Sequence, residues 1–292
     1  MLKIIFSVLV MLPFTSNLYA LSLGAVHHEV RITVAAIEAL KNHYAGDVIS
    51  RVPGIQVGKT TVHAYIKALE LLEKIQKFQH QKNLPVLTVP SLPTKRVRSK
   101  NILAVVTLAQ TELRAITSAL NLTAKSITET TSSKTASDIY EEIWQASYLM
   151  DALIAPIGPS EVMRNTIMIE DGLIDISERI NKPIEFAKLQ TFTDKQPVDV
   201  TISLFKLLYK IAKLERKLKL KPLVVPAFPA GEIKPEDAFD ASGNVIADLT
   251  RIALKLKIAP MNKIDAVNTN VTPNDVYAQV VRLNQAAEFL LK

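Results

Sequence analysis

The sequence predicts an all-α protein made of two tandem four-helix bundles, and three observations lead to this fold class. First, four segments that begin at Lys59, Lys134, Lys195 and Val271 align without gaps. Second, apolar residues recur in each of them at intervals of four and three, as on the buried face of a bundled helix. Third, two proline-rich connectors are separated along the chain by the same distance as the first and third segments. These spacings indicate a duplicated unit of about 137 residues.

The N-terminal stretch 1–20 has the composition of a signal peptide, with one lysine, an apolar run from Ile4 to Phe14 and a polar end at Ala20. The run is too short to span a bilayer. We therefore expect cleavage near Ala20 and a periplasmic or secreted mature chain without a transmembrane segment. An uncleaved membrane anchor is the alternative, because Leu18 stands where a signal peptide usually has a small residue.

The remaining chain divides into two predicted units, residues 21–156 and 157–292, and each is expected to hold four helices of about 20 residues. The approximate helix ranges are 24–44, 59–78, 99–120 and 134–153 in the first unit, and 160–181, 195–214, 235–257 and 271–290 in the second. Together they predict eight helices in two sets of four.

Capping residues mark several of these helix starts. Thr135 with Asp138, and Thr272 with Asp275, have the spacing of an N-terminal capping box. Pro273 falls in the first turn, where a missing N–H group costs nothing. Two similar starts, "GPSEVM" and "KPEDAF", open the helices that follow the unit boundary and the second proline-rich connector.

The two proline-rich connectors, "NLPVLTVPSLP" (83–93) and "LKPLVVPAFP" (220–229), cannot continue a helix. Their length suits an extended strap across the end or side of a bundle, not a tight hairpin. Four strap side chains are expected to cover the core: Val89, Leu92, Val225 and Phe228. The alternative is a partner-binding lip made of the same residues. The Ser/Thr-rich stretch 121–137 is expected to be a mobile loop.

The charge favours anionic partners. The whole chain has a net charge of +7, and removal of the signal peptide takes away one lysine. Polyanions, lipid phosphates or acidic envelope proteins fit this balance, whereas nucleic acid does not, since aromatic residues are only 6% and form no stacking motif. The candidate anion-binding residues are Lys206, Lys210, Lys213 and Lys217 at helical spacing, and Lys95, Arg96 and Arg98 beside the first strap. A solvated helix face is the alternative explanation.

Three tyrosines are candidate ligand-binding residues. Tyr65, Tyr140 and Tyr277 occupy the same position after the helix start in three of the four aligned segments, and Thr201 takes that place in the fourth. Such rings can face a ligand in a bundle core. They can also pack against a neighbouring helix with the hydroxyl on a backbone carbonyl.

The sequence carries no motif for catalysis, and no metal or cofactor is predicted. It has no cysteine and no GxSxG string. None of its five histidines forms an i, i+4 pair. His63 takes the place of the capping aspartate and is expected to cap its helix. An enzyme would need inward-facing charged side chains, and the uniformly apolar seams argue against them.

The sequence therefore favours an exported, soluble and non-catalytic binding or interaction protein. Its partner would be a small ligand, such as an anion, or an envelope protein, as in a sensor-partner module. The alternatives are a metal or haem carrier that uses the N-terminal His27 and His28, a structural scaffold or inhibitor, and an enzyme of an unrecognised type.

Overall fold

The computed structural model describes residues 22–46, 48–128, 133–262, 264 and 270–292. This part of the chain contains eight α-helices and no β-strand. The helices are α1 (Leu23–Tyr44), α2 (Thr61–Gln81), α3 (Ser99–Ala119), α4 (Ala136–Asp151), α5 (Pro159–Arg179), α6 (Pro197–Lys217), α7 (Pro235–Leu256) and α8 (Pro273–Leu291). The predicted signal peptide lies outside the described residues, and so does part of the loop predicted to be mobile.

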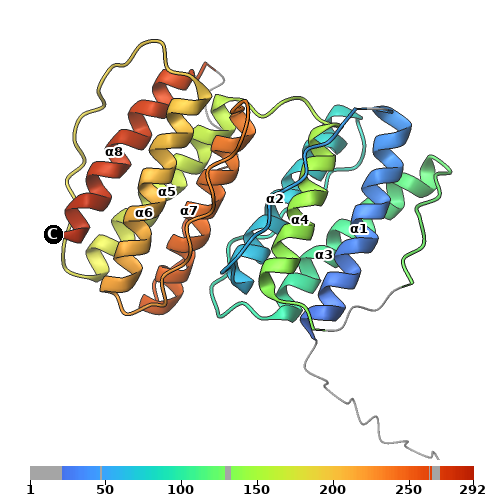
Figure 1. Ribbon diagram of the computed structural model, residues 1–292, viewed down its shortest axis with the longest axis horizontal. Coiled ribbons are helices and arrows are strands. Elements are labelled where there is room, and N and C mark those ends of the chain that lie inside the picture. The colour runs from blue at the N-terminus through green and yellow to red at the C-terminus, as the bar shows by residue number, and fades with distance from the viewer. Residues whose placement is uncertain (1–21, 47, 129–132, 263, 265–269) are drawn as a thin grey trace, which may run out of the picture.

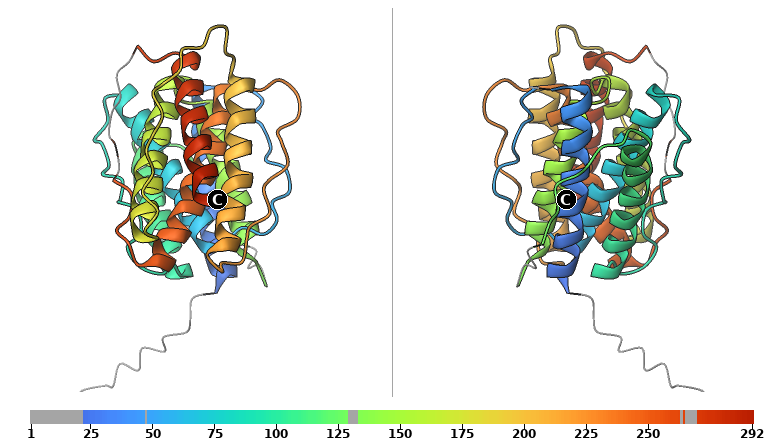
Figure 2. Two further views of the ribbon diagram at one scale, coloured as in Figure 1. Left: turned by 90° about the vertical axis from the view of Figure 1, so that its left-hand side faces the viewer. Right: turned by 90° about the vertical axis from the view of Figure 1, so that its right-hand side faces the viewer.

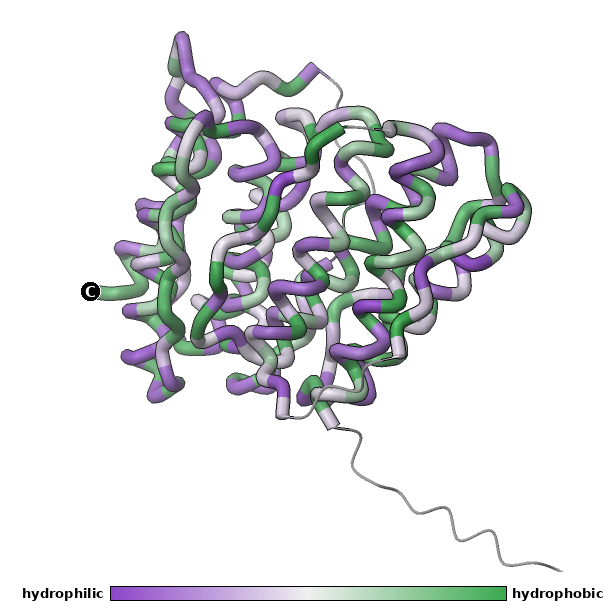
Figure 3. Tube along the Cα trace, turned by 45° about the vertical axis from the view of Figure 1, so that its right-hand side comes forward, coloured by the Kyte–Doolittle hydropathy of each residue, from purple (hydrophilic) through white to green (hydrophobic). Residues whose placement is uncertain are grey.

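The helices form two four-helix bundles that lie side by side (Figure 1). Helices α1–α4 make the first bundle and α5–α8 the second, and α2 packs against α7 where the bundles meet. The predicted all-α, duplicated fold is thus confirmed. Hydrophobic and hydrophilic residues alternate around the helices, as Figure 3 shows, so that each helix has an apolar side to bury.

Within each bundle all four helices run in the same direction. At the starts of α2 and α4, the Lys59 backbone N–H donates to Ser137 Oγ at 3.0 Å, and near their ends Lys74 pairs with Asp151 at 2.6 Å. Each connector must therefore return along the whole bundle, as Figures 1 and 2 show. A helix of this length is about 30 Å long, a distance that an extended connector of about 16 residues spans easily.

The bundles themselves are antiparallel. Lys67 on α2 contacts Asp240 on α7, whereas His63, earlier on α2, contacts Asp248, later on α7. The short connection 152–158 joins the end of α4 to the start of α5 and reverses the chain. Opposite helix dipoles therefore lie side by side at the contact between the bundles.

The helix positions reveal a repeat shorter than the one read from the sequence. The first three helices of the first bundle begin at Leu23, Thr61 and Ser99, which are equally spaced along the chain. One helix and one return connector form this repeat. Each predicted unit therefore consists of four such repeats.

The duplication extends to individual side-chain contacts. Lys74 pairs with Asp151 in the first bundle, and its counterpart Lys210 lies 3.4 Å from Glu288 in the second. Lys59 Nζ lies 4.7 Å above the Tyr140 ring, and the equivalent lysine and tyrosine, Lys195 and Tyr277, have the same separation. Positions in one bundle can thus be compared directly with those in the other.

The predicted caps are present. Thr135 accepts from the Asp138 backbone N–H while the Asp138 carboxylate accepts from the Thr135 N–H, and Thr272 with Asp275 does the same. Pro273 begins α8, and prolines also begin α5, α6 and α7. The capping signals thus located the starts of α4 and α8 correctly.

The two straps differ in their burial. In the first, Val89 and Leu92 are each 8% exposed and belong to the core, as predicted. In the second, Val225 packs partly against the core, but Phe228 is 42% exposed. The prediction for Phe228 is therefore wrong. Its ring instead packs edge-on against Phe205 of α6, with centroids 5.0 Å apart, and lines an open cavity.

One described helix, α3, is long and apolar enough to cross a membrane by length and composition. In the structure it packs against α1 and α2 and buries Ile102, Val105 and Leu113. The core helix of a bundle meets the same criteria.

Candidate functional site

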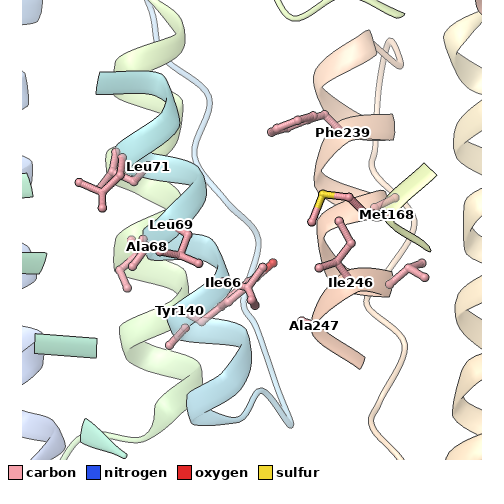
Figure 4. Close-up of a cluster of buried hydrophobic side chains, with 14 of the residues drawn as sticks. Ile66, Ala68, Leu69, Leu71, Tyr140, Met168, Phe239, Ile246 and Ala247 are labelled. Carbon is pink, nitrogen blue, oxygen red and sulfur yellow. The ribbon is translucent and has the colours of Figure 1, made fainter. Parts of the chain in front are cut away.

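The contact between the bundles has an apolar side. Ile66 and Leu69 on α2 face α7, and Phe239 projects from α7 towards them (Figure 4). Met168 of α5 and Ile246 of α7 join this cluster. Burial of these side chains provides the non-directional part of the attraction between the bundles.

The other side of this contact is polar. Helix α2 and the residue before its N-cap contribute one polar stripe: Lys59, His63, Lys67, Glu70 and Lys74. Helix α7 contributes the opposing stripe: Asp237, Asp240, Asn244, Asp248 and Arg251. The first four residues of each stripe are at most 9% exposed. The expectation that no charged side chains face inward is therefore wrong. The apolar seams face the bundle cores, and the charges lie on a second face of α2 that the other bundle covers.

Lys67 lies at the centre of the polar side. Its Nζ is 2.6 Å from Glu70 Oε2 and 2.8 Å from Asp240 Oδ1. Burial alone lowers the pKa of this ammonium group, but Asp240 and Glu70 together raise the pKa well above its ordinary value. Lys67 is therefore a permanent buried cation with two carboxylate partners.

A cavity of about 540 Å³ opens beside this cluster, where α4, α7 and two connectors meet. Trp144 and Tyr148 of α4 form one wall, and Asp237 and Asp240 of α7 form another. Asp240 Oδ2 accepts from the Trp144 indole N–H at 2.9 Å and from the Tyr148 hydroxyl at 3.3 Å. These bonds hold both rings and the carboxylate in fixed orientations.

Two connectors enclose this cavity. The α1–α2 connector contributes residues from the range 51–56, and the α6–α7 connector, which contains the second strap, contributes residues 226–230. They lie next to each other on one face of the molecule (Figure 2). Gly58 has a φ of 71° and approaches the strap so closely that an added Cβ would lie 3.3 Å from Val224 Cγ2.

Arg51 is the only basic residue among the described residues that line this cavity. One of its guanidinium nitrogens, Nη2, donates to Asp237 Oδ1 at 2.7 Å, and its Cζ lies 5.1 Å from the centre of the Tyr148 ring. The second terminal nitrogen, Nη1, is buried without a hydrogen-bond partner in the described ranges. The guanidinium group is thus held by a carboxylate and an aromatic face but is not fully satisfied.

Tyr140 lies behind this cavity without lining it. Its hydroxyl donates to Asn244 Oδ1 at 3.2 Å, and the same oxygen accepts from Lys59 Nζ at 2.6 Å. Burial raises the pKa of Tyr140 and lowers that of Lys59 to about 8. The Tyr140 ring is therefore part of the contact between the bundles, and a side-chain carbonyl takes the place of the backbone carbonyl expected for it.

His63 connects a helix start with the other bundle. Its Nδ1 lies 3.0 Å from the hydroxyl of Thr60, the N-cap residue, and its Nε2 lies 3.0 Å from Asp248 Oδ1. Burial lowers the pKa of His63, although Asp248 acts in the opposite direction. A hydroxyl, an imidazole and a carboxylate also form the chain of a hydrolase triad. Here the three groups do not line the cavity between the bundles. His63 contacts the Thr60 hydroxyl and forms no capping box with it, so the prediction that His63 caps its helix is wrong.

Two carboxyl groups at the edge of the polar contact have raised pKa values. Burial raises the pKa of Asp151 to about 6 in spite of its ion pair with Lys74. Burial and the nearby Asp248 raise the pKa of Glu215 to about 7, against the effect of Arg251. Both pKa values therefore lie close to neutral pH.

A second cavity, of about 740 Å³, lies on the outer side of the second bundle between α6, α8 and residues 183–187. Three of the predicted site residues line it: Lys206, Lys210 and Tyr277. Two others of the lysine stripe do not. Lys213 is exposed to solvent, and Lys217 donates to the Leu290 and Leu291 carbonyls at the end of α8.

The remaining predicted site residues lie elsewhere. Lys95, Arg96 and Arg98 are exposed at the end of the first strap and line neither cavity. Tyr65 is half-buried against the core of the first bundle. The structure thus brings together only part of the predicted set.

Sequence reasoning missed the cavity between the bundles. Trp144, Tyr148, Asp237 and Asp240 stand on helices of different units, and Arg51 on a connector. The available signal was the pair of charged stripes on α2 and α7, which repeat at intervals of three and four. Exposed helix faces show the same spacing, and the sequence does not distinguish them.

Among the described residues, no group of three His, Cys, Asp or Glu side chains is arranged to hold a metal ion. No protein family, curated protein or solved structure matches the chain. The geometry of its own residues is therefore the basis for a functional proposal.

Proposed function

We propose that the protein is an exported, non-catalytic binding protein whose ligand occupies the cavity between the two bundles. The ligand carries an ammonium or guanidinium group. The observation behind this proposal is the convergence of two carboxylates, Asp237 and Asp240, with the rings of Trp144 and Tyr148 on one cavity of ligand size.

The chemistry of the cavity favours a cation. Carboxylates attract a positive group, and aromatic faces add a cation–π contribution that grows as water is excluded. Arg51 already places a guanidinium group there, against Asp237 and Tyr148. A ligand of the same chemistry would displace the Arg51 side chain, whose Nη1 finds no hydrogen-bond partner within the described part of the chain.

The surroundings favour a ligand with an apolar portion. Ile55 is 87% exposed, Val52 79% and Val224 55%, and all three belong to the connectors that enclose the cavity. An apolar group beside the cation would cover part of this rim. This proposal keeps the small ligand that was expected from the sequence. The negative charge expected for that ligand does not suit a cavity lined by two carboxylates.

Trp144 is the only tryptophan of the chain, so its fluorescence reports on this cavity alone. We expect butylguanidine to change that fluorescence in a saturable way and butyrate to leave it unchanged. Arg51→Ala should bind butylguanidine more tightly than the parent protein, since the competing side chain is gone. Asp237→Asn should lose about tenfold in affinity.

The control for Asp237→Asn is Asp199→Asn. Both aspartates accept from the backbone N–H of the N-cap residue in a capping box, but Asp199 lies at the start of α6 and does not line the cavity. The control should therefore bind butylguanidine as the parent does. Equal loss in both variants, or no fluorescence change in any of them, would contradict the proposal.

A further inference from the structure

The second bundle has a face that corresponds to the contact face of the first. The α2 positions of Lys67, Glu70 and Lys74 correspond to Ser203, Lys206 and Lys210 on α6. The α4 positions of Trp144, Ser147 and Tyr148 correspond to Val281, Asn284 and Gln285 on α8. In the first bundle this face is covered by α7, whereas in the second it carries the 740 Å³ cavity.

One position on this open face has the opposite charge. The carboxylate of Glu70 is replaced by the ammonium group of Lys206, and no acidic stripe like that of α7 covers it in the described part of the chain. The Lys206 ammonium is exposed and has no ion-pair partner in the described part of the chain. Lys210 also lines the cavity, with its charge shared between Glu288 and the Asn284 carbonyl.

The balance of charge in this cavity remains positive. Arg282, which also lines it, contacts Glu170 and lies over the Phe186 ring. Two acidic residues line it as well, Glu185 and Glu288, against four basic ones including Lys292. Electrostatic attraction would therefore stabilise an anion in this cavity, most of all beside Lys206.

The cavity also has an unsatisfied buried group and apolar walls. Asn284 is 8% exposed, and its Oδ1 has no hydrogen-bond partner among the residues that the structure describes. Its Nδ2 donates to the Ser203 and Val280 carbonyls, which fixes the orientation of the amide. Apolar side chains, including those of Phe186 and Phe289, line the rest. The Asn284 oxygen would need a hydrogen-bond donor, which an ionised carboxylate lacks, so recognition of an anion here depends on the lysines.

We propose that this cavity is a second binding site, which takes an anionic amphiphile: a carboxylate or phosphate joined to an apolar chain. The head group lies against Lys206 and Lys210, and the apolar chain lies along Phe186, Val281 and Phe289. The site is independent of the cation site between the bundles, because the two share no lining residue in the described ranges.

Isothermal titration calorimetry with dodecanoate and dodecyl phosphate, below their micelle concentrations, tests this proposal. Saturable binding of one molecule is expected for at least one of them, and dodecanol should bind at least about tenfold more weakly. Inorganic phosphate is the third probe. If it binds as tightly as dodecyl phosphate, the site recognises a free anion and the amphiphile proposal is overturned.

Two variants locate the site. Lys206→Gln should weaken dodecanoate binding about tenfold, whereas Lys213→Gln, on an exposed position of the same helix, should not. Val281→Trp introduces the indole that the first bundle has at this position, Trp144, and should weaken binding by occupying the wall along which the apolar chain lies. Unchanged binding in both Lys206→Gln and Val281→Trp would overturn the proposal. Asp237→Asn should leave dodecanoate binding unchanged, which separates this result from the test of the cation site.

Discussion

Glu215 illustrates how a single buried residue can tie stability to pH. Its side chain is inaccessible to solvent, contacts Arg251 and accepts from the Leu223 backbone N–H. Its counterpart in the first bundle is Gln79, whose Oε1 accepts from Leu87 N–H in the same way. In the first bundle a neutral amide therefore accepts the equivalent backbone hydrogen bond.

We expect Glu215→Gln to change the pH dependence of stability. The folded-state pKa of about 7 lies above the ordinary 4.5, so between these values the folded chain binds a proton that the unfolded chain does not. The contribution of Glu215 to stability is thus greatest below pH 4.5 and falls as the pH rises through 7. From about pH 8 to about pH 5 the parent should gain on the order of 2 kcal/mol relative to the variant.

Urea unfolding of both proteins at several pH values checks this expectation. Glu232→Gln, at an exposed position, serves as the control and should follow the parent at every pH. A constant difference between the parent and Glu215→Gln across this pH range would show that the carboxyl group does not titrate within it.

Among the elements, the two straps have equivalent sequences and different roles. Leu92 and Phe228 occupy corresponding positions, yet Leu92 is 8% exposed and packs where the two bundles meet, while Phe228 is 42% exposed. The first strap therefore belongs to the core. The second forms a wall of the cavity between the bundles.

Alanine substitutions at these two positions should separate the roles. Leu92→Ala is expected to lower the free energy of unfolding by about 2 to 3 kcal/mol, because it leaves a buried gap. Phe228→Ala should cost less than about 1 kcal/mol, since much of the ring is already in water. Urea denaturation measures both, and equal losses would contradict the difference in burial.

At the scale of the whole molecule, the bundles are joined by a contact that is partly apolar and partly ionic. Every helix pair except α2 with α7 lies within one bundle, although the buried apolar cluster continues across the contact, so the contact can fail before either bundle unfolds. Lys67 is the central residue of the ionic part, because it makes the shortest ion pairs of two buried carboxylates, Glu70 and Asp240.

We expect Lys67→Met to destabilise the protein by about 3 kcal/mol, since it leaves Asp240 without its cation and Glu70 with only a contact of 3.8 Å to Lys74. Lys213→Met, at an exposed position of α6, should change stability by less than about 0.5 kcal/mol. Calorimetry should show one transition for the parent and two for Lys67→Met. If both variants unfold like the parent, the ionic part does not hold the bundles together.

Much of the fold could be predicted from the sequence. The apolar seams located the helices, and the caps Thr135 and Thr272 located two starts, because both signals act within one helix. The relative arrangement of the bundles could not be predicted. It depends on long-range pairs such as Lys67 with Asp240, and either stripe alone is typical of a solvated helix face.

The candidate sites were predictable only in part, for the same reason. Lys206, Lys210 and Tyr277 fall on α6 and α8, and the sequence identified all three without showing that they share a cavity. The cavity between the bundles combines α4, α7 and two connectors. Its aromatic and acidic residues come together only when the second bundle packs against the first.

The parallel course of the helices also affects how the chain reaches its fold. In a bundle of hairpins, neighbouring helices meet after a short turn is closed. Here two successive helices can pack together only after the connector between them has returned along the length of the bundle. The entropy of closing such long segments is lost before packing stabilises them, so this protein should fold more slowly than other helical proteins of its size.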